Sequence, residues 1–259
     1  MKVVILCGGK GTRLREETEY RPKPMVGIGG QPILWHVMKT YAHYGFQDFV
    51  LCLGYKGEMI KQYFLSYHWL NSNFTIELGS QRVDLLNGRQ EVNWRVTLVD
   101  TGLNAMTGAR VSRVEPYVDG DIFMLTYGDG VTDLNINALL HFHKSHGKIG
   151  TVTSVFPPSR YGELTIDGDQ VMSFREKPRV RETYVSGGYF VFNRAFFQYL
   201  CAENSCVLER EPLEQLAQDG QLKVYHHDGF WQCMDTARDL NYLQELWDQD
   251  SAPWRVWDD

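Results

Sequence analysis

The chain opens with an apolar run, residues 2–7 (KVVILC), that ends abruptly in the glycine-rich segment GGKGTRL of residues 8–14. A short apolar run bounded by glycines is typical of a buried strand that turns sharply at its carboxyl end. Closely spaced glycines let backbone N–H groups approach a bound anion without intervening side chains. Arg13, and Lys23 between two prolines, add fixed positive charge nearby. The beginning of the chain therefore predicts a strand, a sharp turn and a phosphate site.

The glycine segment fits neither of two common nucleotide-binding loops. No Gly-Lys-Ser or Gly-Lys-Thr closes a P-loop, and Leu14 stands where the dinucleotide fingerprint G-x-G-x-x-G requires its last glycine. A dinucleotide-dependent dehydrogenase is therefore disfavoured. Glycines after a strand also form plain turns, so this segment needs support from the rest of the chain.

Apolar patterns along the first 156 residues alternate between strand and helix. Strands separated by helical segments of this length favour right-handed βαβ units and a mainly parallel sheet in an α/β fold. We expect strands at 49–53, 74–78, 95–100, 122–127 and 151–156, and helices near 34–41, 60–67, 107–118 and 135–146.

The pattern changes from residue 163 onward. Two short apolar segments, 163–166 and 171–175, flank Asp-Gly-Asp-Gln and predict a hairpin. Beyond it we expect a strand at 186–192, two helices, an extended stretch at 221–226 and a final helix from Thr236. The polar residues 79–94 are expected to form a surface loop or projecting arm, and either a solvated excursion or an oligomer contact fits them.

The composition of the chain limits the classes of function that it can have. The chain has 259 residues, 43% apolar and 22% charged, which is ordinary for a globular protein large enough to bury a core. A net charge of −6 disfavours nucleic-acid binding, where a basic face is expected. Five cysteines without a CxxC pair predict no disulfide framework. No signal-peptide pattern and no apolar run near 18 residues predict a cytoplasmic protein without a membrane partner.

Two aspartates stand where ligands of a phosphate-bound metal are expected. Asp129 lies between glycines directly after the apolar segment 122–127, and Asp235 lies at the start of the final helix. Mg²⁺ bound to a triphosphate takes only one or two protein carboxylates. An Asp between glycines is also a common turn former, and Asp235 could serve as a helix cap. The sequence does not show that the two aspartates meet in space.

Motifs in the same order across almost the entire chain identify a family. LCGGKGTRL, PKPMV, GGQPILWH, TYGDGV, SFREKP, GGYFV and GFWQCMDT together resemble the sugar-phosphate nucleotidylyltransferases over roughly residues 1–257. TYGDG, MTG-x-R and FWQ-x-MDT resemble the cytidylyltransferase branch. The resemblance implies transfer of a cytidylyl group from CTP to α-D-glucose 1-phosphate, giving CDP-glucose and pyrophosphate with Mg²⁺ as cofactor.

The resemblance also implies a role for particular positions. Arg13, Lys23 and Asp129 would be catalytic, and Asp129 and Asp235 would hold the metal. The nucleotide would be bound by Leu6, Cys7, Gly8, Gly9, Lys10, Gly11, Thr12, Arg13, Lys23, Thr107, Gly108, Arg110 and Gly128. The sugar phosphate would be bound by Glu176, Lys177, Ser186, Gly187 and Glu211.

Three residues depart from the family pattern. Cys7 replaces alanine, Cys233 replaces a proline, and Ser186 stands where asparagine commonly contacts the sugar. Serine is shorter and offers a single hydroxyl, so the identity of the sugar stays open. UTP or dTTP in place of CTP, and a non-catalytic protein that binds a nucleotide sugar, also stay open.

The expected architecture follows from the same resemblance. It is a Rossmann-like three-layer α/β sandwich with a mainly parallel mixed sheet, of the nucleotide-diphospho-sugar transferase type, plus a small sugar-binding β subregion. Residues 1–259 would form a single nucleotidyltransferase domain, 1–150 mainly for the nucleotide and 151–259 mainly for the sugar phosphate. We also expect a homo-oligomer, with a hexamer as the family form.

Overall fold

Alternating side chains in the central strands build a sheet with two apolar faces. The computed structural model describes residues 1–88, 93–157, 163–175 and 184–257. Within these ranges β13 is the one strand of the large sheet that runs antiparallel to its neighbours, so the sheet is mixed and mainly parallel, as predicted. In order across the sheet the strands are β14 (Leu222–His227), β10 (Gly150–Val155), β13 (Val185–Asn193), β8 (Ile122–Tyr127), β1 (Lys2–Leu6), β4 (Asp48–Leu53) and β7 (Arg95–Asp100).

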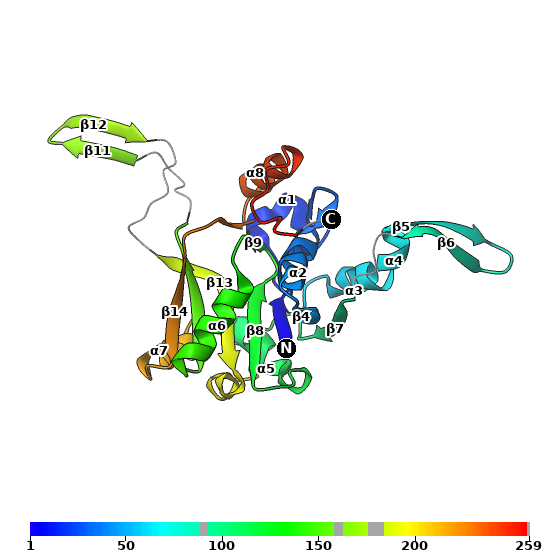
Figure 1. The fold of residues 1–259 in the computed structure, drawn as a ribbon, viewed down its shortest axis with the longest axis horizontal. Coiled ribbons are helices and arrows are strands. Elements are labelled where there is room, and N and C mark those ends of the chain that lie inside the picture. Colours follow the sequence, from blue (N-terminus) through cyan, green and yellow to red (C-terminus); the bar gives the residue numbers. More distant parts are fainter. Residues whose placement is uncertain (89–92, 158–162, 176–183, 258–259) are drawn as a thin grey trace.

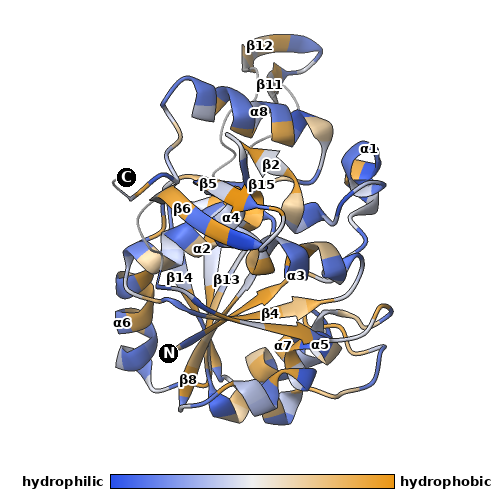
Figure 2. Ribbon diagram, turned by 90° about the vertical axis from the view of Figure 1, so that its right-hand side faces the viewer, coloured by the Kyte–Doolittle hydropathy of each residue, from blue (hydrophilic) through white to orange (hydrophobic). Residues whose placement is uncertain are grey.

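Helices cover both faces, which makes the predicted three-layer sandwich (Figure 1). Because side chains alternate along a strand, Val3 and Ile5 of β1 pack into one layer and Val4 and Leu6 into the other. The first layer contains α2 (Ile33–His43), α3 (Gly57–Leu65), α4 (Tyr67–Leu70), α6 (Ile136–His146) and α8 (Ala237–Asp248). The second contains α5 (Thr107–Arg113), α7 (Glu211–Gln218) and the 3-10 helix η4 (Arg194–Tyr199). Figure 2 shows the apolar central strands between helices that turn polar residues outward.

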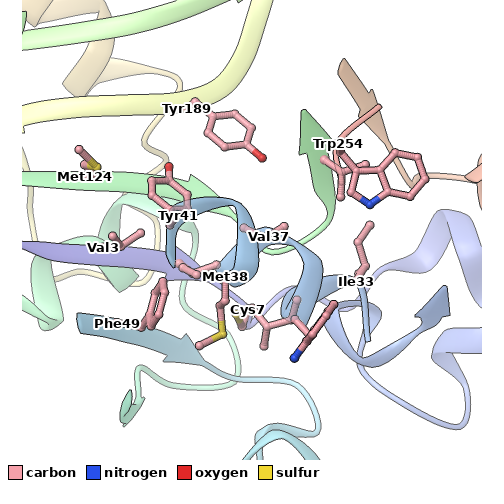
Figure 3. Close-up of a cluster of buried hydrophobic side chains, with 14 of the residues drawn as sticks. Val3, Cys7, Ile33, Val37, Met38, Tyr41, Phe49, Met124, Tyr189 and Trp254 are labelled. Atoms are coloured by element: carbon pink, nitrogen blue, oxygen red, sulfur yellow. The ribbon is translucent and has the colours of Figure 1, made fainter. Parts of the chain in front are cut away.

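The core on the first face is centred on α2 (Figure 3). Tyr41 of α2 stacks on Tyr189 of β13 with ring centroids 6.0 Å apart. His36, also on α2, accepts from the indole Nε1 of Trp254 at 3.3 Å and hydrogen-bonds the Ile28 carbonyl through Nε2 at 2.9 Å. Burial lowers the pKa of His36 to about 4, so the ring is neutral at neutral pH, and its bond to Trp254 fastens the C-terminal segment to α2.

Short two-stranded ladders surround the sheet. They are β2 (Gly27–Ile28) with β3 (Gln31–Pro32), β5 (Ser72–Glu77) with β6 (Arg82–Gly88), β9 (Gly130–Thr132) with β15 (Trp231–Cys233), and β11 (Glu163–Asp167) with β12 (Gln170–Arg175). The last pair is the predicted hairpin. The remaining short elements are α1 (Arg15–Thr18), η1 (Thr12–Leu14), η2 (Lys23–Met25) and η3 (Glu115–Tyr117).

Two expectations about these elements need correction. The helix expected over 107–118 ends at Arg113 and is followed by η3, because Pro116 cannot donate to a continuing helical ladder. The polar segment 79–94 is not wholly irregular, since part of it forms β6 and pairs with β5. That hairpin extends away from the body of the molecule, as expected of an arm (Figure 1).

No helix of the described ranges is both long and apolar enough to cross a membrane.

Candidate functional site

The glycine segment after β1 lines a cavity of about 550 Å³. The cavity lies beyond the carboxyl ends of β1 and β8, where ligands of open α/β sheets bind. Its volume falls within the range of sites that hold a small molecule. The lining comes from residues 6–13, Lys23, Pro24, residues 103–107, Arg110, Tyr127 and Asp129.

Four charged side chains meet in a cluster, and three of them, Arg13, Lys23 and Asp129, line this cavity. The Nζ of Lys23 lies 2.7 Å from an Oδ of Asp129 and 2.6 Å from an Oδ of Asp235. Arg13 reaches the other Oδ of Asp235 at 2.6 Å. Lys23 is 8% exposed, whereas Arg13 is mostly exposed. Two cations and two carboxylates are therefore held together beside the glycine segment.

The protonation states of this cluster follow from its contacts. Burial alone would lower the pKa of Lys23, but the Asp129 carboxylate and hydrogen bonds to both aspartates raise it above its ordinary value. Burial alone would raise the pKa of Asp235, but the Lys23 hydrogen bond and the charges of Lys23 and Arg13 lower it. Lys23 and Asp235 are therefore charged at neutral pH, and the two cations of the cluster are suited to bind phosphate.

Backbone pairing between β9 and β15 brings the two aspartates together. Gly130 of β9 pairs with Cys233 of β15, and the Met234 N–H donates to the Asp129 carbonyl at 2.9 Å. Asp129 directly precedes β9, and Asp235 follows β15 by two residues. Thr236 then caps α8 in a reciprocal capping box. Asp235 is therefore not the N-cap of that helix, which removes the plain capping role left open by its sequence position.

The carboxylates form a candidate metal centre. One ligand atom each from Asp129, Asp235 and Cys233 lies within 4.8 Å of the others. Two carboxylates from different strand ends match the one or two that Mg²⁺ takes when phosphates supply further oxygens. Burial, followed by the charge of Asp129, raises the pKa of the Cys233 thiol, so it is neutral and a poor ligand for this hard cation. The donor set fits Mg²⁺ through its two aspartates.

The glycines of the first loop serve different purposes. A Cβ on Gly8 would lie 2.2 Å from Nη1 of Arg110, so this glycine makes room for a guanidinium. Gly9 has open space where a Cβ would point, which leaves its backbone accessible to a ligand. Gly11 has φ +61°, a conformation that side chains other than glycine rarely adopt. Thr18 fastens the turn by donating to the Gly11 carbonyl at 3.0 Å.

Arg110 supports the glycine loop through hydrogen bonds. Its guanidinium donates to the carbonyls of Gly8 at 3.0 Å and Leu53 at 2.8 Å, and to the Thr101 hydroxyl at 2.8 Å. The side chain is buried, and the residue lines the cavity with much of its donor capacity already used by protein acceptors. Its geometry therefore indicates a role in fixing the loop.

Most residues predicted to bind nucleotide line the cavity. Residues 6–13, Lys23, Thr107 and Arg110 do so. Gly108 and Gly128 are buried next to the lining instead. A Cβ on Gly108 would lie 2.7 Å from the Cys206 sulfur, and the Gly128 N–H donates to the Leu6 carbonyl at 3.0 Å. Both glycines thus allow close packing behind the cavity wall.

The residues predicted to bind sugar phosphate are only partly placed. Glu176 and Lys177 lie outside the described residues. Ser186 and Gly187 lie near the start of β13, where the Gly187 carbonyl accepts from the indole of Trp231 at 2.7 Å. Glu211 is exposed in the first turn of α7 and is not part of the described cavity lining.

The structure adds two residues that the sequence did not single out. Glu209 accepts hydrogen bonds from the hydroxyls of Tyr127 and Thr107, and both of those residues line the cavity. Tyr127 belongs to the motif TYGDG, which marked its neighbourhood but not its side chain. Glu209 had no local signal beyond its closeness in sequence to Glu211.

Comparisons with known proteins show the family of this chain. Residues 2–247 match the nucleotidyl transferase family. The chain is 51% identical to the glucose-1-phosphate cytidylyltransferase of Salmonella typhi over the full length of both proteins. It is 42% identical to the probable glucose-1-phosphate cytidylyltransferase of Bacillus subtilis, over 99% of this chain and all of the relative.

A solved structure supports the fold. The crystal structure of HddC from Yersinia pseudotuberculosis superposes with a TM-score of 0.69 at 23% sequence identity, covering 95% of this chain and 99% of that one. The sequence relatives thus match the full length of the chain, and the solved structure matches nearly all of its fold. The chain belongs to the nucleotidyl transferase family and is a full-length relative of its glucose-1-phosphate cytidylyltransferases.

Proposed function

We propose that this protein transfers a cytidylyl group from CTP to α-D-glucose 1-phosphate, giving CDP-glucose and pyrophosphate. The observation that carries the proposal is the convergence of Lys23, Asp129 and Asp235 beside the glycine loop, in a chain related over its full length to glucose-1-phosphate cytidylyltransferases. A phosphate oxygen of the sugar phosphate attacks the α-phosphorus of CTP in line, the bond to the β-phosphate oxygen breaks, and pyrophosphate leaves. The attacking oxygen is already anionic, so the reaction needs no general base.

Electrostatics is the main task of such a site. Two anionic substrates must approach each other where water is partly excluded, and their repulsion is costly there. Residues 6–13 would surround the triphosphate with backbone N–H groups and the side chains of Lys10, Thr12 and Arg13. Lys23 and Arg13 would bind phosphate oxygens and stabilise the negative charge that develops on pyrophosphate. The buried position of Lys23 makes its charge more effective than that of a solvated lysine.

Asp129 and Asp235 are the residues that would hold Mg²⁺. The ion, when bound, supplies positive charge to phosphate oxygens and helps to orient them. Asp129 would also be catalytic in the sense that it places this charge next to the reacting phosphate. Cys233, which is neutral, would remain a neighbour of the ion and not a ligand.

The sugar phosphate would bind on the β13 side of the site. Ser186 and Gly187 are proposed to contact the sugar, while Glu176 and Lys177 would contact the sugar phosphate, as the resemblance implies. Glu211 is retained as a proposed sugar contact on the same ground. Residues 1–150 and 151–259 would then serve mainly nucleotide and mainly sugar phosphate within one domain. A homo-oligomer located in the cytoplasm is part of the same proposal.

Release of pyrophosphate tests the proposal. Purified protein with Mg²⁺ is expected to release pyrophosphate from CTP only when glucose 1-phosphate is added, and to form CDP-glucose in equal amount. Lys23→Ala is the matched inactive variant, since it removes the cation between the aspartates. Pyrophosphate release without a sugar phosphate, or none with any nucleotide and sugar pair, would contradict the proposed reaction.

A further inference from the structure

A single carboxylate joins two hydroxyl groups of the cavity wall. The Tyr127 hydroxyl donates to one oxygen of Glu209, and the Thr107 hydroxyl donates to the other at 2.7 Å. Thr107 is the first residue of α5, and Tyr127 is the last residue of β8. Glu209 therefore links two separate elements of the cavity wall without being among the residues that line the cavity.

This arrangement determines which hydrogen-bonding groups the wall presents. A carboxylate has only acceptors, so each hydroxyl must use its one proton on Glu209. The Thr107 oxygen also accepts from the Leu208 N–H at 2.9 Å, which leaves it a single lone pair. Both hydroxyls can therefore act toward the cavity only as acceptors.

The position of the Tyr127 oxygen is also fixed. The Tyr127 ring lies against Gly188, where a Cβ would come within 2.5 Å of the ring carbon Cδ2. Gly188 has φ +77°, so glycine is favoured there both by its backbone and by the ring above it. The ring packed on Gly188 and the hydroxyl bound to Glu209 together leave little freedom for rotation. The acceptor is consequently preorganised before a ligand arrives.

We propose that Glu209 is a positioning and specificity residue that makes the Thr107 end of the cavity an acceptor surface and so selects an amino-bearing pyrimidine. Cytosine carries an exocyclic amine, a donor, where uracil and thymine carry a carbonyl oxygen, an acceptor. An acceptor facing a second acceptor leaves both without a partner, and such mismatches discriminate strongly between ligands. The inference rests on the proposed use of CTP, because it identifies the group that distinguishes CTP from UTP.

Calorimetric titration with CTP and with UTP, each with Mg²⁺ and without sugar phosphate, tests the proposal. The native protein is expected to bind CTP at least about tenfold more tightly than UTP. Glu209→Gln should reduce that ratio to about threefold or less, because the amide can donate to one hydroxyl and free its proton to face the cavity. Glu209→Asp keeps the carboxylate and should restore part of the preference. Glu214→Gln, the same change on an exposed position of α7, should leave the ratio unaltered.

The outcomes separate this proposal from the proposed reaction. Equal loss of affinity for CTP and UTP in Glu209→Gln, with an unchanged ratio, would show a merely structural residue and overturn the proposal. A native protein that does not prefer CTP would also overturn it. Tight, CTP-selective binding without pyrophosphate release in the presence of glucose 1-phosphate would contradict the reaction alone. Circular dichroism on each variant verifies folding, which an exposed residue such as Glu209 should not disturb.

Discussion

The two ends of the candidate site are built in different ways. At the proposed nucleotide end, ion pairs of 2.6–2.7 Å and the β9–β15 ladder fix Lys23, Asp129 and Asp235. At the proposed sugar end, Ser186 and Gly187 offer one small hydroxyl and backbone groups. The fixed charges suit the triphosphate that all nucleotides share, the hydroxyls held by Glu209 would penalise a base of the wrong hydrogen-bonding pattern, and small residues exclude mainly by shape. We therefore expect this chain to be strict toward the nucleotide and more tolerant toward the sugar.

Loss of a carboxylate proposed to bind the metal should have the largest effect. Asp129→Asn removes a charge that balances Lys23 and would hold Mg²⁺, so turnover is expected to fall by about a thousandfold or more. Steady-state pyrophosphate release measures it. Asp169→Asn, in the turn between β11 and β12, is the matched control and should retain full turnover. Comparable activity in Asp129→Asn would remove this residue from the metal centre.

The buried His36 allows a test of the stability of the core on which both ends of the site are built. Its folded pKa of about 4 lies below the ordinary 6.5, so the unfolded chain binds the extra proton between these values. Stability should therefore fall as pH decreases from 6.5 to 4, by up to about 3 kcal/mol from this residue, and level off below 4.

Urea unfolding at a series of pH values measures this slope. His36→Gln, although less stable at neutral pH, should show a flatter dependence over the same window. Substrate selectivity of the variant should match that of the native protein at neutral pH, because His36 touches neither end. A slope identical to that of the native protein would show that other groups dominate the acid response.

The paired glycines distinguish support of the loop from contact with the ligand. Gly8→Ala would drive a methyl group into Arg110, so it should lower thermal stability and weaken CTP binding by about tenfold. Gly9→Ala meets nothing within 4 Å and should leave stability nearly unchanged while still weakening CTP binding. Thermal unfolding and titration of both variants measure the contrast. Equal stability losses would show that Arg110 does not depend on the space at Gly8.

The smallest effect is expected at the sugar end. Ser186→Asn adds an amide at the position where the family commonly has one, so the KM for glucose 1-phosphate should change by a few fold. The KM for CTP should stay the same. Steady-state kinetics with each substrate varied in turn measures both values. A change confined to CTP would show that Ser186 belongs to the nucleotide end.

The sheet could be predicted from the sequence because its strands are apolar and bounded by turn residues. β8 and β7 have the predicted boundaries, and β4 begins one residue earlier than predicted. β6 was missed although Val83 and Leu85 alternate with polar residues, because the polar residues on either side of this short stretch favoured a loop. Pro116 shortened a helix whose spacing alone suggested a longer one.

The sequence allowed us to predict which residues form the charged cluster, but not how they contact one another. Asp129 and Asp235 meet through β9 and β15, strands of three residues each that are about a hundred positions apart, and no local pattern encodes that pairing. Arg110 was expected to line the nucleotide pocket and does line the cavity, but the sequence did not show that its donors also hold the carbonyls of Gly8 and Leu53. Glu209 was not predicted because it contacts Thr107 and Tyr127, which lie far from it in the sequence. Which side chain a donor meets depends on packing, which a single sequence does not show.

The most direct measurement is the rate of pyrophosphate release in a matrix of CTP, UTP, dTTP, ATP and GTP against several sugar 1-phosphates, with Mg²⁺ present. We expect the rate with CTP to exceed that with every other nucleotide by at least about tenfold for each sugar used, and at least one sugar 1-phosphate besides glucose 1-phosphate to be turned over. The opposite pattern, several nucleotides accepted but a single sugar, would contradict the proposed difference between the two ends.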